Sequence, residues 1–209
     1  MRESNFCRGL RGVTDAFVFP FGMNCRRLVA SLLGLITMAP LAVGAPDKGS
    51  VLSDSIKPVT AAPNATVNPG QPFISRDALT PDEANAYLDF EVTLKMRNME
   101  DLQARLGRGD HISPAEMAEK YEPRKGEYQA VLEWLIGDGF TITRRDSQHI
   151  SIFVRGKIGQ IAHAFHVKFA RVSCDGKDYS AAVSPPEVPT TIAPLLVGIN
   201  GLQPYLRMH

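Results

Sequence analysis

His163 and His166 lie three residues apart in a segment with helical periodicity, a spacing at which both side chains could bind one metal ion. The neighbouring sequence offers no third ligand, so solvated or half-buried histidines are the simpler interpretation. Serine, histidine and aspartate all occur, but no Gly-x-Ser-x-Gly elbow frames a serine. The paired carboxylates at positions 82–83 and 100–101 stand at expected helix starts, where the helix dipole favours negative charge. We therefore predict no catalytic set, no cofactor and no metal site.

The N-terminus has the organisation of a secretory signal peptide. Two arginines precede an apolar run, residues 28–45, that ends in small residues. Gly44 and Ala45 are the cleavage candidates, and Met23 is an alternative start that would shorten the long charged region. An uncleaved membrane anchor is the competing interpretation, disfavoured by Pro40 and by a run shorter than the roughly 20 apolar residues of a span. We predict a secreted or periplasmic protein with no stable membrane association after leader cleavage.

Composition and charge narrow the classes of function. The 209 residues are 44% hydrophobic and 22% charged, which is ordinary for a globular domain. The formal net charge is +1. Without residues 1–45 there remain 18 Lys and Arg and 20 Asp and Glu, so the net charge becomes 18 − 20 = −2. The basic residues are scattered and not clustered, which argues against a nucleic-acid partner.

The cysteines cannot form an internal disulfide in the mature chain. Cys7 and Cys25 belong to the predicted leader, and only Cys174 remains. A reactive thiol is one interpretation of Cys174, and a strand residue beside a turn is the other. The second is favoured, because no histidine is near it in sequence and nothing there suggests thiolate activation.

The segment from 46 to 78 is rich in Pro, Ala, Ser, Asn and Thr. It has too few large apolar residues to offset the entropy cost of ordering. We therefore predict a disordered tether between the leader and a folded domain at residues 79–202, with residues 203–209 as a truncated linker.

The folded part alternates strand and helix patterns. Period-two alternation predicts strands at 88–96, 140–145, 149–156, 167–173 and 177–182, and apolar residues at i, i+3, i+4 and i+7 predict helices at 125–137 and 158–165. The major elements run strand, helix, strand, strand, helix, strand. That order predicts an α+β fold, a ferredoxin-like antiparallel sheet with helices packed on one face. A last helix is expected from Pro189, because Ile192, Leu195, Leu196 and Ile199 also have helical spacing.

Two short helices are expected between the first strand and the long helix. The segment 99–107 has Leu102 and Leu106 four residues apart and is ended by glycines. In the next helix, Ser113 can cap the first turn, Pro114 suits its first position, and Glu116 can complete a capping box. The apolar stripe of this helix is too small to form a core of its own.

Four ordered segments resemble the activation domain of the pro-kumamolisin type, the propeptide of sedolisin-family serine-carboxyl peptidases. They are ISPAEMAEKYEP, EYQAVLEWLIGDGFTI, HISIFVRGKIGQIAHAF and KDYSAAVSPPEVPTTIAPLLVGINGL, and the resemblance covers roughly Leu88 to Leu202. It implies a propeptide-like sandwich that precedes a peptidase domain, helps it fold, and covers its active site until acid releases it. The partner it implies is a sedolisin-type catalytic domain, in trans or lost in cis.

The chain departs from that family where the peptidase would be. It has no Gly-Thr-Ser nucleophile motif, no Glu followed four residues later by Asp, and no room for the family's calcium site. We therefore predict that it is not itself a peptidase. Two alternatives stay open: a secreted ferredoxin-like module that binds a ligand or envelope component, and a gene fragment without a present role.

Residues for contact and for pH sensing follow from the same interpretation. The contact candidates are Trp134, as an aromatic anchor if it is exposed, and Tyr205, Leu206 and Arg207 at the junction beyond the domain. The candidates for protonation at an interface are His111, His149, His163 and His166.

Overall fold

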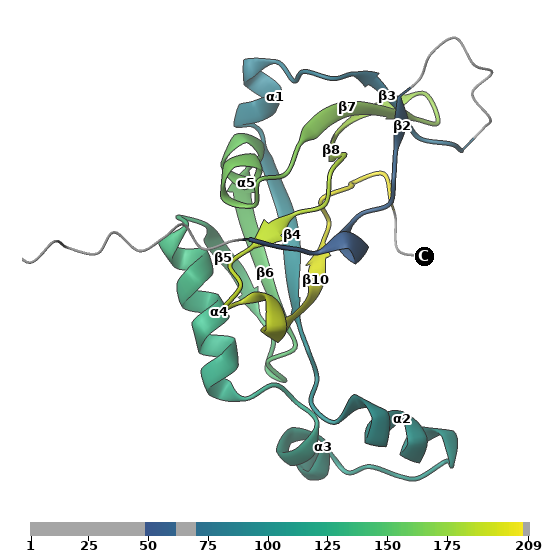
Figure 1. Cartoon of the computed structure of the whole chain (residues 1–209), viewed down its shortest axis with the longest axis vertical. Helices are drawn as coiled ribbons and strands as arrows, with labels where there is room; N and C mark the ends of the chain where they lie inside the picture. The colour runs from purple at the N-terminus through teal and green to yellow at the C-terminus, as the bar shows by residue number, and fades with distance from the viewer. Residues whose placement is uncertain (1–48, 62–69, 207–209) are drawn as a thin grey trace, which may run out of the picture. The chain divides into compact units, whose positions relative to one another are not determined.

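A computed structural model describes residues 49–61 and 70–206 of the chain. The predicted leader, its cleavage candidates Gly44 and Ala45, and Arg207 lie outside the described residues. Helices and antiparallel strands are mixed along the chain, so the predicted α+β class is confirmed (Figure 1). No helix in the described ranges is long and apolar enough to cross a membrane.

The first sheet has four antiparallel strands in the order β10-β4-β6-β5. Their bounds are β4 (Tyr87–Leu94), β5 (Thr141–Arg145), β6 (Ser151–Lys157) and β10 (Leu196–Asn200). Phe90 lies opposite Val154, and Val92 lies opposite Ile152, so the apolar residues of the central pair share one face. Alternation within β4 therefore buries one side of the sheet and leaves its polar side outward.

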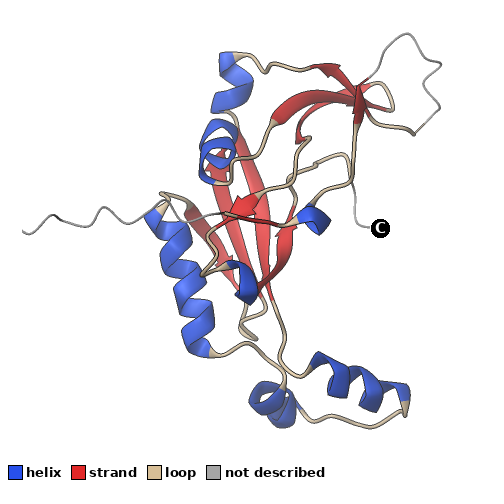
Figure 2. Ribbon diagram, viewed as in Figure 1, coloured by secondary structure: helices blue, strands red, loops and turns tan. Residues whose placement is uncertain are grey.

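Two helices cover the apolar face. In α4 (Lys125–Gly137) the residues at helical spacing, Tyr128, Val131, Leu132 and Leu135, are buried. In α5 (Ile158–Ala164) Ile158 and Ile161 are buried, and all of these side chains belong to the same core as β4 and β6. Figure 2 shows both helices beside the sheet. The predicted helices at 125–137 and 158–165 are therefore confirmed.

The second sheet differs from the single sheet that we predicted. It has the order β2-β3-β7-β8, formed by β2 (Thr60–Ala61), β3 (Phe73–Arg76), β7 (Phe169–Cys174) and β8 (Lys177–Ala182). The hairpin β7–β8 turns through Asp175-Gly176, both with positive φ, which suits a two-residue turn. The strand expected to complete the first sheet is thus in a second sheet, and β10 takes its place.

The prediction of a helix that begins at Pro189 is wrong. Only the short 3-10 turn η2 (Ala193–Leu195) forms, and the chain then enters β10. Leu196 and Ile199 are buried, but as strand residues, because β10 pairs with β4 from Leu196 to Asn200. Pairing with an existing strand supplies backbone hydrogen bonds that local helical periodicity cannot reveal.

The disordered tether predicted at 46–78 is wrong for several of the residues that the structure describes. Ordered elements there are β1 (Ser50–Val51), η1 (Ser53–Ser55), β2 and β3. β1 pairs with β9 (Glu187–Val188), and β3 pairs with β7. Backbone pairing with strands far along the chain orders a segment that has few apolar side chains of its own.

Three short helices flank β4. The capping box of α1 (Pro81–Asn85) is formed by Thr80 and Glu83. The other two, α2 (Met99–Gly107) and α3 (Pro114–Lys120), follow β4 and lie beyond its end in Figure 1. The Ser113 cap is confirmed, since its Oγ accepts from the Glu116 N–H at 3.2 Å. The predicted capping box is wrong, because the Glu116 carboxylate bonds Arg105 and Lys120 instead.

Candidate interaction surface

The outward side of the first sheet carries polar side chains and two aromatic residues, Phe153 and, at the start of β4, Tyr87, which is 66% exposed. We call it the open face, and its residues are Tyr87, Asp89, Glu91, Thr93, Arg144, Ser151, Phe153, Arg155 and Asn200. The alternation of β4 and β6 places them opposite the core face. A bulge in β5 between Ile142 and Arg144 sets Arg144 opposite Phe153 and so brings it to the same side.

An ion pair joins the two central strands on the open face. Arg155 lies opposite Asp89 and donates Nε to Oδ1 at 2.7 Å and Nη2 to Oδ2 at 2.8 Å. This bidentate hydrogen bonding lowers the pKa of Asp89 below its usual value. About half or more of each side chain is exposed, 50% for Arg155 and 62% for Asp89, so the pair is accessible to a partner.

Two further hydrogen bonds order the remaining polar groups. Ser151 donates its hydroxyl to the carboxylate of Glu91, and Asn200 donates Nδ2 to the Thr93 hydroxyl at 3.1 Å. Each bond crosses between neighbouring strands. The face is therefore a preorganised array, and a binding partner would meet side chains whose positions are already fixed.

Phe153 is the aromatic centre of the open face. Its ring is half-buried, and the Arg144 guanidinium carbon lies 3.7 Å from the ring centroid, a cation–π contact. The two side chains line a shallow hollow of about 430 Å³ with Arg145, Asp146, Ser147 and Ser151. An aromatic ring with an adjacent arginine is the composition of a protein-binding anchor, so this arrangement can recognise a partner.

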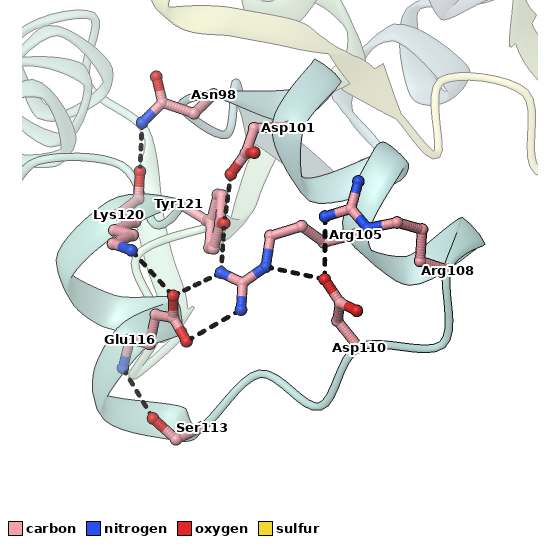
Figure 3. Close-up of polar contacts among 9 residues, drawn as sticks. All are labelled: Asn98, Asp101, Arg105, Arg108, Asp110, Ser113, Glu116, Lys120 and Tyr121. Carbon is pink, nitrogen blue, oxygen red and sulfur yellow. Dashed lines mark hydrogen bonds and ion pairs between the residues drawn. The ribbon is translucent and has the colours of Figure 1, made fainter.

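A second polar cluster fixes α2 against α3 (Figure 3). The Arg105 guanidinium bonds the Glu116 carboxylate and donates Nη1 to the Tyr121 hydroxyl at 3.0 Å. Tyr121, which is fully buried, donates in turn to Asp101 at 2.6 Å. Hydrogen bonds from Arg105 first and Lys120 second lower the pKa of Glu116 to about 2. The helix pair is therefore held mainly by charge-assisted bonds, since Tyr121 and Leu102 are its only fully buried side chains within the described part of the chain.

A third cluster joins α1 to the second sheet. The Glu83 carboxylate accepts from the Thr80 N–H at 2.6 Å, from the Thr80 hydroxyl at 2.8 Å and from Arg171 Nε at 2.7 Å, and it also pairs with Arg76. The hydrogen bonds from Thr80 and then from Arg171 lower the pKa of Glu83 to about 2. One carboxylate thus connects β3, α1 and β7.

Of the predicted contact residues, Trp134 and Tyr205 pack against other parts of the domain, whereas Leu206 lines a hollow with Asn200 at the edge of the open face. Trp134 of α4 is half-buried, and its ring packs on Phe165 with centroids 5.6 Å apart. Tyr205 packs edge-on against Tyr179, burial raises its pKa to about 12, and its hydroxyl has no hydrogen-bond partner within the described ranges. Leu206 is 40% exposed. The structure does not bring these three residues together.

The four candidate histidines are also dispersed. His111, His163 and His166 are exposed, and His149 is half-buried with its ring 4.9 Å from that of Tyr128. His166 Nδ1 lies 3.5 Å from a Glu187 carboxylate oxygen. None of the four belongs to the open face.

The structure also locates the remaining reactive groups. Cys174 lies at the end of β7, where burial raises the pKa of its thiol, with the charge of Asp175 as a second cause. A raised pKa disfavours the reactive thiolate. Within residues 49–61 and 70–206, no three His, Cys, Asp or Glu side chains come together as a metal site would need.

Sequence reasoning did not single out Phe153 or Arg144. One signal was present: the alternation that places Ile152 and Val154 inward also places Phe153 outward. The position of Arg144 depends on a bulge, which alternation alone does not show.

Comparison with known proteins gives two matches. Residues 76–205 match the family model described as pro-kumamolisin, activation domain. Xanthomonalisin from Xanthomonas sp. (strain T-22) is 29% identical over 184 residues, a region that covers 83% of this chain and 22% of xanthomonalisin. The chain therefore spans less than a quarter of the length of that relative. The family match includes all four strands that carry the open face.

Proposed function

The chain belongs to the family of pro-kumamolisin activation domains, and from this premise we propose that it acts as the propeptide of a sedolisin-type serine peptidase. In this role it assists folding of the catalytic domain and inhibits it until acid releases the complex. It performs no catalysis itself. We further propose that it acts outside the cytoplasm, secreted or periplasmic, after removal of residues 1–45.

The observation that carries the proposal is the extent of the family match. Residues 76–205 include the first sheet, both covering helices and the α2–α3 pair, so the match extends over most of the folded unit. The matched region is an activation domain and not a catalytic domain. A propeptide acts by binding, so a contact surface is the site that it needs.

We propose the open face as that surface. It presents Phe153 with Arg144 as an anchor, surrounded by the Asp89–Arg155 pair and the hydrogen-bonded groups of Glu91 and Thr93. A central aromatic group with a polar periphery is the usual anatomy of a protein interface. The opposite side of the sheet is covered by α4 and α5, so it cannot be the contact surface.

Acid release follows from carboxylates paired across the interface. A carboxylate that gains a cationic partner has a pKa below its free value of about 4, so its contribution to binding is present above that value. The contribution is lost as pH falls through the lowered pKa. The pH-sensing candidates His111, His149, His163 and His166 lie off the open face, so acid release through this surface rests on its carboxylates.

The test is a binding measurement between the full chain and a purified sedolisin-type catalytic domain from pH 7 to pH 3. We expect tight binding at neutral pH that weakens progressively with acid. Phe153→Ala should weaken binding about tenfold or more at pH 7, the loss typical of an interface anchor. Ile136→Ala is the matched control, because Ile136 is 51% exposed on α4, on the other side of the sheet.

Three outcomes would contradict the proposal in different ways. Equal affinity at both ends of the pH range would exclude acid release. Equal losses for the Phe153 and Ile136 variants would exclude the open face. Absence of any binding or inhibition at neutral pH would exclude the inhibitor role and favour a ligand- or envelope-binding module instead.

A further inference from the structure

Gln203 is the one polar or charged residue that is fully buried in the described part of the chain, at 4% exposure. Both hydrogens of its side-chain amide and its carbonyl oxygen take part in hydrogen bonds. Oε1 accepts from the Lys57 N–H at 2.7 Å, and Nε2 donates to the Lys57 carbonyl at 2.8 Å and to the Ala182 carbonyl at 2.9 Å. Gln203 therefore bonds Lys57 as a neighbouring strand would, through one donor and one acceptor.

Lys57 is the last residue of a segment that precedes β4, the earliest strand of the first sheet, in the sequence. We call residues 49–57 the strap. It pairs with β9, and the Leu52 N–H donates to the Pro186 carbonyl at 2.9 Å. Leu52 and Ile56 pack against the main core. The strap lies upstream of residues 76–205, which match the family model, but inside the region aligned with xanthomonalisin, which covers 83% of this chain.

The strap also covers the free edge of the first sheet. β10 pairs with β4 on one side only, so its other side presents unpaired backbone groups. The Ile199 N–H on that side donates to the Ser55 hydroxyl at 2.9 Å. A Cβ at Gly198 would lie 3.1 Å from the same oxygen, so the strap and β10 are in close contact.

The C-terminal segment leaves the domain from the same place. The Leu202 carbonyl accepts from the Ala182 N–H at 2.9 Å, and the Leu206 N–H closes a turn onto the Gln203 carbonyl at 3.0 Å. The strap, the end of β8 and the turn at 203–206 thus meet at the Gln203 amide. Asp54, Lys57, Gln203 and Leu206 are among the residues that line a hollow between the strap and the turn at 203–206.

We propose that the strap fixes the path along which the chain leaves the domain after Leu202, and that Gln203 is the positioning residue that couples the two. Opening of the strap would free the turn at 203–206, and loss of the Gln203 amide would free the strap. The consequence for the peptidase rests on the proposed function: the strap would set the direction in which the domain presents its C-terminal end.

Hydrogen exchange of individual amides in the full chain tests this coupling. In Gln203→Ala we expect exchange about tenfold or more faster at Leu52 and Ile199, whose amides do not bond Gln203, and also at Leu206. The amide of Val92, in the middle of the first sheet, should keep its rate. Gln129→Ala is the matched control, since Gln129 is an exposed glutamine whose side chain bonds its helix neighbour Glu133 at 3.0 Å.

The reverse experiment begins at the strap. Ser55→Ala removes the acceptor of Ile199 and should speed exchange at Leu206, on the other side of the Gln203 amide. Faster exchange of the Gln203 variant at Lys57 alone, with Leu52 and Ile199 unchanged, would overturn the coupling.

Faster amide exchange at Val92 in Gln203→Ala would mean that the whole sheet is destabilised, and the Ser55→Ala variant then tests the coupling. In that variant an unchanged exchange rate at Leu206 overturns the proposal, and a faster rate supports it. These measurements need no peptidase. Their failure is therefore distinct from failure of the proposed function.

Discussion

Gly156 of β6 lies where the sheet is closest to an aromatic ring of the core. A Cβ added to it would lie 2.6 Å from Phe140 Cδ1 and 3.3 Å from Ile161 Cγ1. Gly156→Ala should therefore lower the free energy of unfolding by about 1 to 3 kcal/mol through overpacking. Gly126→Ala is the control, since nothing lies within 4 Å of its Cβ position. Chemical denaturation should show a loss for the first variant only; equal stability of the two would mean that the Phe140 ring moves aside freely.

Trp134 is half-buried, so its contribution to stability should be smaller than that of a core aromatic residue. Its ring contacts Phe165, which is fully buried. We expect Trp134→Ala to lower the unfolding free energy by about 2 kcal/mol, against about 3 to 5 kcal/mol for a fully buried aromatic side chain. If the melting temperature of the variant lies within a degree or two of that of the parent, Trp134 contributes little to the core and is again a candidate interface residue.

At the scale of the element, α3 is stabilised by a side chain that precedes it by some 20 residues. Arg97 donates Nε to the Glu122 carbonyl at 2.6 Å and Nη2 to the Glu119 carbonyl, and Asn98 donates to the Lys120 carbonyl at 2.9 Å. The last carbonyls of a helix have no partner within it. Arg97 and Asn98 therefore cap α3 from outside and attach it to the end of β4.

Arg97→Ala should loosen α3 without disturbing the sandwich. Three charge-assisted hydrogen bonds are lost, to the Glu122, Glu119 and Ala118 carbonyls, and we expect the unfolding free energy to fall by about 1 to 3 kcal/mol. Amide exchange should rise across residues 114–122 and stay unchanged in β6. Lys95→Ala, on an exposed neighbour, is the control. Equal exchange rates in the two variants would show that α3 is held by its own contacts with α2.

At the scale of the whole molecule, two carboxylates determine how the fold responds to acid. Glu83 and Glu116 each have a pKa of about 2 because of the donors around them. A carboxylate with a lowered pKa in the folded state contributes stability that is fully present above its unfolded value of about 4 and is lost as pH falls through the lowered one. Both contributions should therefore persist at pH 4 and be lost only toward pH 2.

The melting temperature between pH 7 and pH 2 tests this expectation, with the single tryptophan as the probe. Glu83→Gln and Glu116→Gln should each melt lower than the parent at pH 7, because a neutral amide pairs poorly with arginine. The difference should hold down to about pH 4 and shrink toward pH 2. Gln substitution at Glu133, an exposed residue of α4, is the control. Cooperative unfolding of the parent above pH 4 would contradict the assignment and would make unfolding the route of release.

The sequence by itself determined the local elements. The alternation of apolar and polar residues in β4, and the helical spacing of apolar residues in α4 and α5, indicate which face of each element is buried. This pattern is the strongest indication of local structure in the sequence. The order of these elements was sufficient for the α+β class and, with the four matching segments, for the family resemblance. The Ser113 cap was equally readable, because a cap is completed within three residues.

The tertiary structure alone decided which strands share a sheet and which side chains meet. β10 has the apolar spacing of a helix and is a strand because β4 offers it backbone partners, and the strap is ordered by contacts with residues more than 130 positions away. Glu116 was expected to close its own helix turn, but Arg105 provides a stronger, charged donor. The Phe153–Arg144 contact requires a bulge, and the Gln203 bonds require three distant segments. Pairings of this kind depend on distance in space, which the spacing of residues along one chain does not encode.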